Sequence, residues 1–240
     1  MKARKATNIL LIIFIIMASV FGGLFVYKEF LQKDTKYIGT WQREVDITDY
    51  VTDSMDVWLG TAVMGNGTDY GTGRVVITMT LRMDKDGNWS ESVDEASYES
   101  ACAAAKAVAL AGLYNFLDRR MAATDMSAEL AGKTTEEIVV EAVGMSGEEY
   151  LEKYGPVLLP SLDDLKLRYN DGGTYAVDGN VMARRGLYGT AYETFAIDKK
   201  VMIIAGRTDA TSASDSLAVS IGGDNDMQQL TAYPIVYNAK

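Results

Sequence analysis

The clearest alternation of hydrophobic and polar residues begins at residue 75 and ends at residue 83. Every second side chain is apolar, and the residues between them are mainly polar. A period of two places the apolar side chains on one face of a β-strand. The turn-forming sequence Asp-Lys-Asp-Gly-Asn follows at 84–88 and predicts a hairpin whose second strand covers 89–93. The five apolar residues of the first strand are Val75, Ile77, Met79, Leu81 and Met83.

Similar patterns predict further strands on both sides of this hairpin. An alternating segment at 37–47 predicts a first strand. The next residues, 48–60, have N-cap residues and then apolar side chains at three- and four-residue spacing, which predicts a short helix with Asp49, Asp53 and Asp56 on its solvated face. Short strands return beyond residue 170 as two hairpins and a last strand. These segments are 173–184, 192–206 and 229–237.

The period changes to that of a helix at about residue 94. An Ala-rich segment without proline, 97–120, predicts one long helix, and Lys106 within it argues against a second membrane span. Two capping-box patterns follow before Gly155-Pro156. They are Thr134 with Glu137 and Ser146 with Glu149. Residues of about 95–165 therefore predict a helical insertion between strands.

An uncharged, strongly apolar segment lies near the N-terminus. It covers residues 8–27 and follows the bases Lys2, Arg4 and Lys5. At about 1.5 Å per residue a helix of this length spans the roughly 30 Å of a bilayer's hydrocarbon core, so we expect a membrane anchor with a cytoplasmic N-terminus. A cleaved signal peptide, with processing near Gly22 and Gly23, is the alternative.

These elements predict three parts of the chain. Residues 1–28 hold the cytoplasmic bases and the anchor, 29–36 form a polar tether, and 37–240 form an extracytoplasmic domain. The expected fold class is mainly β with a helical insertion. Eight strands in meander order with short hairpins favour a closed antiparallel barrel, because closure removes the edges of the sheet.

The triplet Gly39-Thr40-Trp41 opens the first predicted strand and is followed by a short helix and a meander of strands. In these features the chain resembles the lipocalin and fatty-acid-binding superfamily, and more closely membrane-anchored bacterial proteins with a lipocalin-like domain. The N-terminal span, the Asp-Gly-Asn-Trp hairpin and the final Tyr-Pro-Ile-Val-Tyr strand contribute to the likeness. The resemblance covers about 1–94 and 170–240. It implies a lipocalin-like barrel in which Trp41 packs across the closed end.

Composition removes most of the usual side chains of hydrolytic and metal chemistry. The chain has no histidine and a single cysteine, Cys102, so no Ser-His-Asp triad, Cys-His pair or Cys/His zinc site can form. We interpret Cys102 as a small core residue of the Ala-rich helix. No spacing selects a pair of catalytic carboxylates, and no motif indicates a metal or a cofactor. The sequence therefore predicts a protein that is not an enzyme.

The charge distribution makes nucleic acid an unexpected partner. From residue 28 on, the chain retains 20 of its 23 basic residues against all 33 acidic ones, a net charge of −13. Binding to a phosphate backbone needs clustered Lys and Arg instead.

Two hypotheses of function are preferred over a third, an enzyme of unknown reaction that paired carboxylates in a cleft would indicate. In the first, the barrel binds a lipid or another apolar small molecule, because an eight-stranded barrel has room for its own side chains or one small ligand. The side chains at 75, 77, 79, 81 and 83 then form the cavity wall, and the insertion acts as a lid. In the second, the barrel is filled and the protein contacts an envelope protein or a wall polymer.

Overall fold

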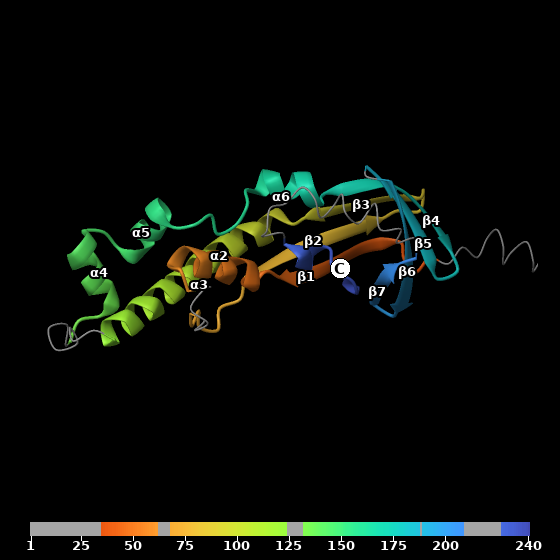
Figure 1. The fold of residues 1–240 in the computed structure, drawn as a ribbon. Coiled ribbons are helices and arrows are strands. Elements are labelled where there is room, and N and C mark those ends of the chain that lie inside the picture. The colour runs from red at the N-terminus through yellow and green to blue at the C-terminus, as the bar shows by residue number, and fades with distance from the viewer. Residues whose placement is uncertain (1–34, 62–67, 124–131, 188, 209–226) are drawn as a thin grey trace, which may run out of the picture. The chain divides into compact units, whose positions relative to one another are not determined.

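Eight antiparallel strands form a closed barrel in the computed structural model of this chain (Figure 1). The structure describes residues 35–61, 68–123, 132–187, 189–208 and 227–240. Each strand pairs with the next, and β8 returns to pair with β1, so the predicted antiparallel barrel is confirmed. The strands are β1 (Gly39–Asp46), β2 (Val76–Met83), β3 (Asn88–Val93), β4 (Asp171–Asp178), β5 (Val181–Gly186), β6 (Gly189–Asp198), β7 (Val201–Arg207) and β8 (Ile235–Ala239).

The alternating pattern of the first strands sets which side chains enter the barrel. Trp41 lies opposite Leu81 in the β1–β2 register, and Met83 lies opposite Trp89 in the β2–β3 register. Paired residues point to the same face, and all four of these side chains are buried. Trp41, with 3% of its surface exposed, is thus a core residue of the barrel.

The described helices lie between β1 and β2 and between β3 and β4 (Figure 1). Both predicted capping boxes are confirmed: Thr134 and Ser146 each accept from the backbone N–H of a glutamate three residues on, and that glutamate bonds back to the cap. A short 3₁₀ helix, η3, precedes β8. The elements are α2 (Thr48–Leu59), α3 (Glu95–Ala122), α4 (Thr135–Val143), α5 (Gly147–Tyr154), α6 (Leu162–Tyr169) and η3 (Gln228–Leu230).

The first half of α3 shares one core with the barrel strands. Ala105 and Val108 belong to the same buried cluster as Ile77, Met79 and Val93. Leu165 of α6 is also fully buried in that cluster. The helical insertion therefore supplies core to the domain in addition to any role as a lid.

The last strand differs from its prediction. We expected it at 229–237, but β8 starts only at Ile235, and η3 occupies the residues before it. Met227 and Leu230 turn into the core cluster, and Arg43 donates from Nη2 to the carbonyl oxygen of Leu230. Burial of these two side chains holds the backbone out of the β-ladder.

The predicted anchor, residues 8–27, lies outside the described residues and stays a prediction. Among the residues that are described, one helix, α3, is long and apolar enough to cross a membrane by length and composition alone. About a third of its apolar window is buried inside the domain. Its apolar character thus belongs in part to the core, and in part to an outer face that the domain leaves uncovered.

Gly173 of β4 is required by close backbone packing. A Cβ there would lie 2.0 Å from the carbonyl oxygen of Arg185, on a backbone that cannot yield easily. We expect Gly173→Ala to lower the free energy of unfolding by about 1–3 kcal/mol through overpacking. Gly206→Ala is the matched control, because no atom lies within 4 Å of its Cβ position, and should change stability by less than about 0.5 kcal/mol. Urea unfolding of both variants measures the difference, and equal values would contradict the steric argument.

Candidate functional site

The predicted cavity wall lies in the buried interior. Val75, Ile77, Met79, Leu81 and Met83 are at most 3% exposed. The first three belong to the core cluster that includes α3, and the last two lie beside Trp41 and Trp89 through the strand register. A ligand-contacting role for these five residues stays a prediction.

A fork of two hydrogen bonds joins Arg184 to Glu193 inside the barrel. The Nε of Arg184 donates to Oε2 of Glu193 at 2.6 Å, and its Nη2 donates to Oε1 at 2.7 Å. Arg184 is 8% exposed and Glu193 is fully buried. The residues come from the neighbouring strands β5 and β6. This two-bond geometry is the strongest form of an arginine–carboxylate pair.

A second carboxylate links this pair to another buried arginine. Glu91 of β3 lies 3.4 Å from an Nη of Arg43 and 3.4 Å from an Nη of Arg184. The hydroxyl of Tyr237 also donates to Glu91, and that of Tyr233 donates to Glu193 at 2.6 Å. We call these side chains the barrel ion cluster. Its members are Arg43, Glu91, Arg184, Glu193, Tyr233 and Tyr237.

Aromatic rings and protonated phenols complete the cluster. Burial and the charge of Glu91 raise the pKa of Tyr237 well above its usual value, and burial and Glu193 raise the pKa of Tyr233. Both phenols therefore stay protonated donors near neutral pH. Burial alone lowers the pKa of Arg184, but the hydrogen bonds and charge of Glu193 outweigh it and hold that pKa above its usual value. The guanidinium of Arg184 also lies 4.7 Å from the centre of the Trp89 ring.

The cluster balances its own charge. Two arginines face two glutamates, so it offers no net charge to an incoming anionic ligand. The apolar pattern of the strands did not reveal these residues, although Arg43, Glu91 and Arg184 occupy inward positions. The available signal is a charged residue in line with buried ones: Arg43 alternates with Trp41 and Val45 on β1, and Glu91 alternates with Trp89 and Val93 on β3.

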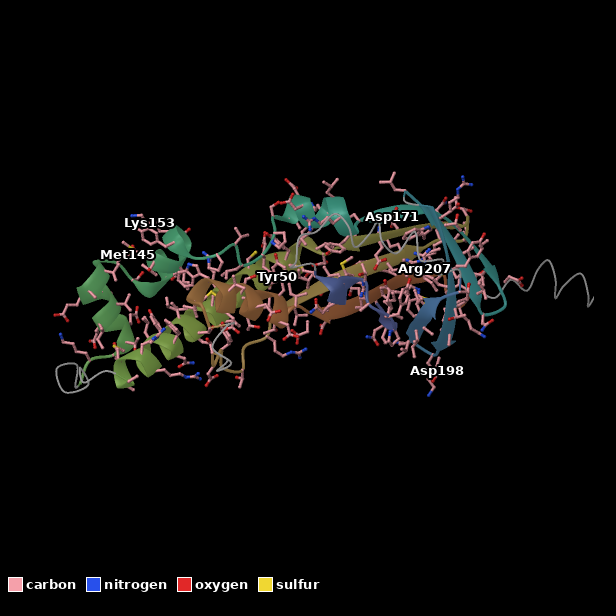
Figure 2. All side chains as sticks on the ribbon, viewed as in Figure 1. Tyr50, Met145, Lys153, Asp171, Asp198 and Arg207 are labelled. Carbon is pink, nitrogen blue, oxygen red and sulfur yellow. The ribbon has the colours of Figure 1, made fainter. Side chains whose placement is uncertain are left out.

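An apolar cleft lies in the helical insertion. A cleft of about 530 Å³ opens between α3, α5 and the segment before α6. We call it the α3–α5 cleft. Figure 2 shows the side chains of this region around the labelled Lys153, apart from the barrel side chains around Asp171 and Arg207. The lining residues are Cys102, Ala103, Ala105, Lys106, Ala107, Leu110, Glu148, Leu151, Glu152, Pro156, Leu158 and Leu159.

Cys102 lines this cleft and is only half-buried, which corrects its interpretation as a core residue. The buried face of α3 includes Ala105, Ala109 and Leu113, and at its start it is Ala101 that is buried, not Cys102. Burial and the adjacent Cys102 thiol raise the pKa of Tyr98 to about 12. The thiol therefore lies at the boundary between core and cleft.

A second cleft, of about 430 Å³, lies further along α3, and we call it the α3–α4 cleft. Its α3 residues continue the stripe of the first cleft at three- and four-residue spacing, from Leu110 to Leu113, Leu117 and Met121. One face of α3 therefore borders both clefts. The lining residues are Trp58, Leu59, Leu113, Phe116, Leu117, Met121, Thr135, Ile138, Val139, Ala142, Val143 and Tyr150.

Comparison with known proteins gives no further guide to the site. No family model, no curated protein and no solved structure matches this chain. In the part of the chain that the structure describes, no three His, Cys, Asp or Glu side chains gather as a metal-ligand set. The chemistry of the two clefts and of the barrel interior is therefore argued from their own geometry.

Proposed function

We propose that this chain is a non-enzymatic binding protein, anchored in the cell membrane by residues 8–27, with its barrel domain outside the cytoplasm. Its ligand is an apolar small molecule, and the site is the α3–α5 cleft. The observation that carries this proposal is the cleft itself: about 530 Å³ with mainly apolar walls. Small-molecule sites usually enclose about 300–1,000 Å³ and have such walls.

The barrel interior is a poorer site than the cleft. Its middle is occupied by the barrel ion cluster, whose arginines already face carboxylates. Large side chains such as Met182, Met202 and Ile204 fill further inward positions and are fully buried. A ligand inside the barrel would have to displace them. This moves the expected binding site from the strand 75–83 to the helical insertion.

The lining of the cleft indicates the class of ligand. Leu110, Leu151 and Leu158 offer a surface for a hydrocarbon chain, while Lys106 and Glu152 add charged groups to the same cleft. Lys106 is exposed, so its ammonium can meet a polar head without losing its contact with water. A single-chain amphiphile, with its chain in the cleft and its head at Lys106, matches this arrangement.

The proposed lipocalin-like assignment rests on the barrel. Eight antiparallel strands close in meander order, and Gly39-Thr40-Trp41 begins β1 with Trp41 buried. An anchored domain of this kind would work next to a bilayer, which is a source of single-chain amphiphiles. The predicted anchor thus supports the location, and the cleft supports the ligand class.

The reactivity of Cys102 tests the proposal, because it is the chain's only cysteine and lines the cleft. The barrel and its core lie within residues 35–240, so that fragment can be studied without detergent. We expect palmitate or lysophosphatidylcholine, below its micellar concentration, to slow the reaction of the thiol with Ellman's reagent about tenfold or more, since a bound chain covers Cys102.

Two matched variants give this measurement its control. Leu151→Gln places an amide in the cleft and should remove the protection, whereas Leu167→Gln changes a leucine that is 74% exposed outside it and should retain it. Circular dichroism confirms that both variants are folded. An unchanged reaction rate with every probe in the unsubstituted fragment would reject the α3–α5 cleft as the site.

A further inference from the structure

The α3–α4 cleft differs from the ligand cleft in its walls. Four helices contribute to it, and its lining is mainly apolar, with Thr135, the hydroxyl of Tyr150 and the indole N–H of Trp58 as polar groups. Trp58 and Tyr150 lie against each other, with ring centres 6.1 Å apart. The floor is formed by Leu113, which is buried, and by the half-buried Phe116. The α3–α4 cleft is therefore a groove with aromatic and aliphatic walls.

The groove and two of the helices that form it leave apolar side chains open to water. Val143 lines the groove with 43% of its surface exposed. Outside the lining, Val140 on the same helix is 45% exposed and Val57 on α2 is 68% exposed. Single exposed apolar residues are common on proteins, but an apolar groove that keeps an exposed wall is typical of an interaction site. The groove therefore has the features of a docking surface.

The charges around the groove restrict its partner. The helices α2, α4 and α5 together carry nine acidic residues and one basic residue, Lys153. Two glutamates serve the capping boxes and Glu141 pairs with Lys133, but these interactions are local and exposed. Arg120, at the end of α3, stacks on Phe116. Arg119 and Arg120 end α3, and Glu148 and Glu152 line the other cleft, but the three helices α2, α4 and α5 still carry a clear excess of negative charge. This excess favours a partner with basic residues.

The shape of the groove restricts the partner further. Its α3 residues run from Leu113 to Met121, a length of roughly 12 Å at 1.5 Å per residue. Recognition of a helix in a groove uses apolar anchors at i, i+3, i+4 and i+7, which span a similar length. We infer that the α3–α4 cleft is a docking groove for a basic amphipathic helix of a partner protein. The groove is separate from the proposed ligand site, so either can hold without the other.

A designed peptide tests this inference on the full chain, purified in a mild detergent. The probe is a fluorescent peptide of about 18 residues with leucine at the positions of one helix face and lysine on the other. The control peptide keeps the leucines and carries glutamate in place of lysine. We expect fluorescence anisotropy to show saturable binding of the lysine peptide, weakened by added salt, and at least about tenfold weaker binding of the glutamate peptide.

Two substitutions with the same charge change locate the binding. Val143→Lys removes an apolar wall of the groove and adds a cation facing the peptide, so we expect about tenfold weaker binding. Val157→Lys makes the same change at a valine that is 75% exposed and lines neither cleft, and should bind as the unsubstituted chain. Both sites are exposed, so neither change threatens the fold.

The remaining outcomes overturn the inference. Equal binding of the two peptides would show that apolar contact alone drives binding. Equal loss of binding in both variants would show that the net charge of the chain drives binding without the groove. Sedimentation of the unsubstituted chain tests whether a second copy of the chain occupies the groove. A dimer that Val143→Lys disperses would assign the groove to a second copy of this chain instead of a basic helix.

Discussion

Replacement of Glu193 by alanine is expected to lower the free energy of unfolding by about 3–5 kcal/mol. Glu193 is fully buried and holds Arg184 through two hydrogen bonds while accepting a third from Tyr233. Its removal leaves the guanidinium of Arg184 buried, with the longer 3.4 Å contact to Glu91 as its remaining ion pair and the ring of Trp89 beside it. Breaking a buried ion pair by removing one partner carries a penalty of this size, because a charge stays uncompensated in a poorly polarisable interior. Urea unfolding of residues 35–240 measures it.

Glu44→Ala is the matched control for this variant. Glu44 lies on β1 next to Arg43, but its side chain is exposed on the outer face of the barrel. We expect a change within about 0.5 kcal/mol. A third variant, with Arg184→Met and Glu193→Leu combined, tests whether the unpaired charge causes the loss of stability. It leaves no buried charge unpaired at this position, so most of the stability should return. A Glu193→Ala protein as stable as Glu44→Ala would mean that the cluster is not buried as described.

Local patterns were sufficient to predict most elements of this fold. The alternation at 75–83 became β2, and the helical spacing at 48–60 became α2. Thr134 and Ser146 capped helices as expected, since a capping box needs only residues within one turn. The pairings β2–β3, β4–β5, β5–β6 and β6–β7 then followed, because consecutive strands joined by short turns pair with each other. These features depend on residues that are close together in the chain, so the sequence alone is enough to predict them.

Features that depend on distant residues were not predictable in this way. Leu230 reads as part of a strand, yet it is buried against the core and its carbonyl accepts from Arg43, which is 187 residues away in the chain. Tertiary burial decided its conformation over local propensity. The same holds for Asp56, placed on a solvated helix face. Its carboxylate accepts from Thr61 and Tyr70, and these hydrogen bonds outweigh burial and lower its pKa.

For the candidate sites too, the local features were predictable from the sequence and the features that depend on distant residues were not. The five apolar residues from Val75 to Met83 were correctly expected on one buried face, but the strand pattern could not tell a cavity wall from a filled core. The two clefts arise where α4 and α5 pack against α3, and no local pattern reports how closely separate helices approach. Cys102 illustrates this limit, because a difference of one position on α3 moves it from the core to the cleft.

Replacement of Ala105 by aspartate is expected to unfold the barrel together with the insertion. Ala105 is 1% exposed in the core cluster that joins α3 to Ile77 and Met79. A carboxylate at this position would be buried without a partner, at a cost of about 3–5 kcal/mol. This is a large part of the roughly 5–15 kcal/mol by which a typical domain is stable. We expect a large fall in the urea midpoint, seen equally by helical circular dichroism and by tryptophan fluorescence.

The two signals distinguish a helical lid from a helical core. With Trp58 replaced by phenylalanine, the remaining tryptophans, Trp41 and Trp89, both report on the barrel. If the insertion were only a lid, Ala105→Asp would reduce the helical signal and leave the fluorescence transition where it was. Ala107→Asp, at an exposed position two residues on, makes the same change in helix propensity without burial and should leave both transitions nearly unchanged. Coincident loss in the first variant alone would establish that the surface presenting both clefts is held rigid by the same core as the barrel.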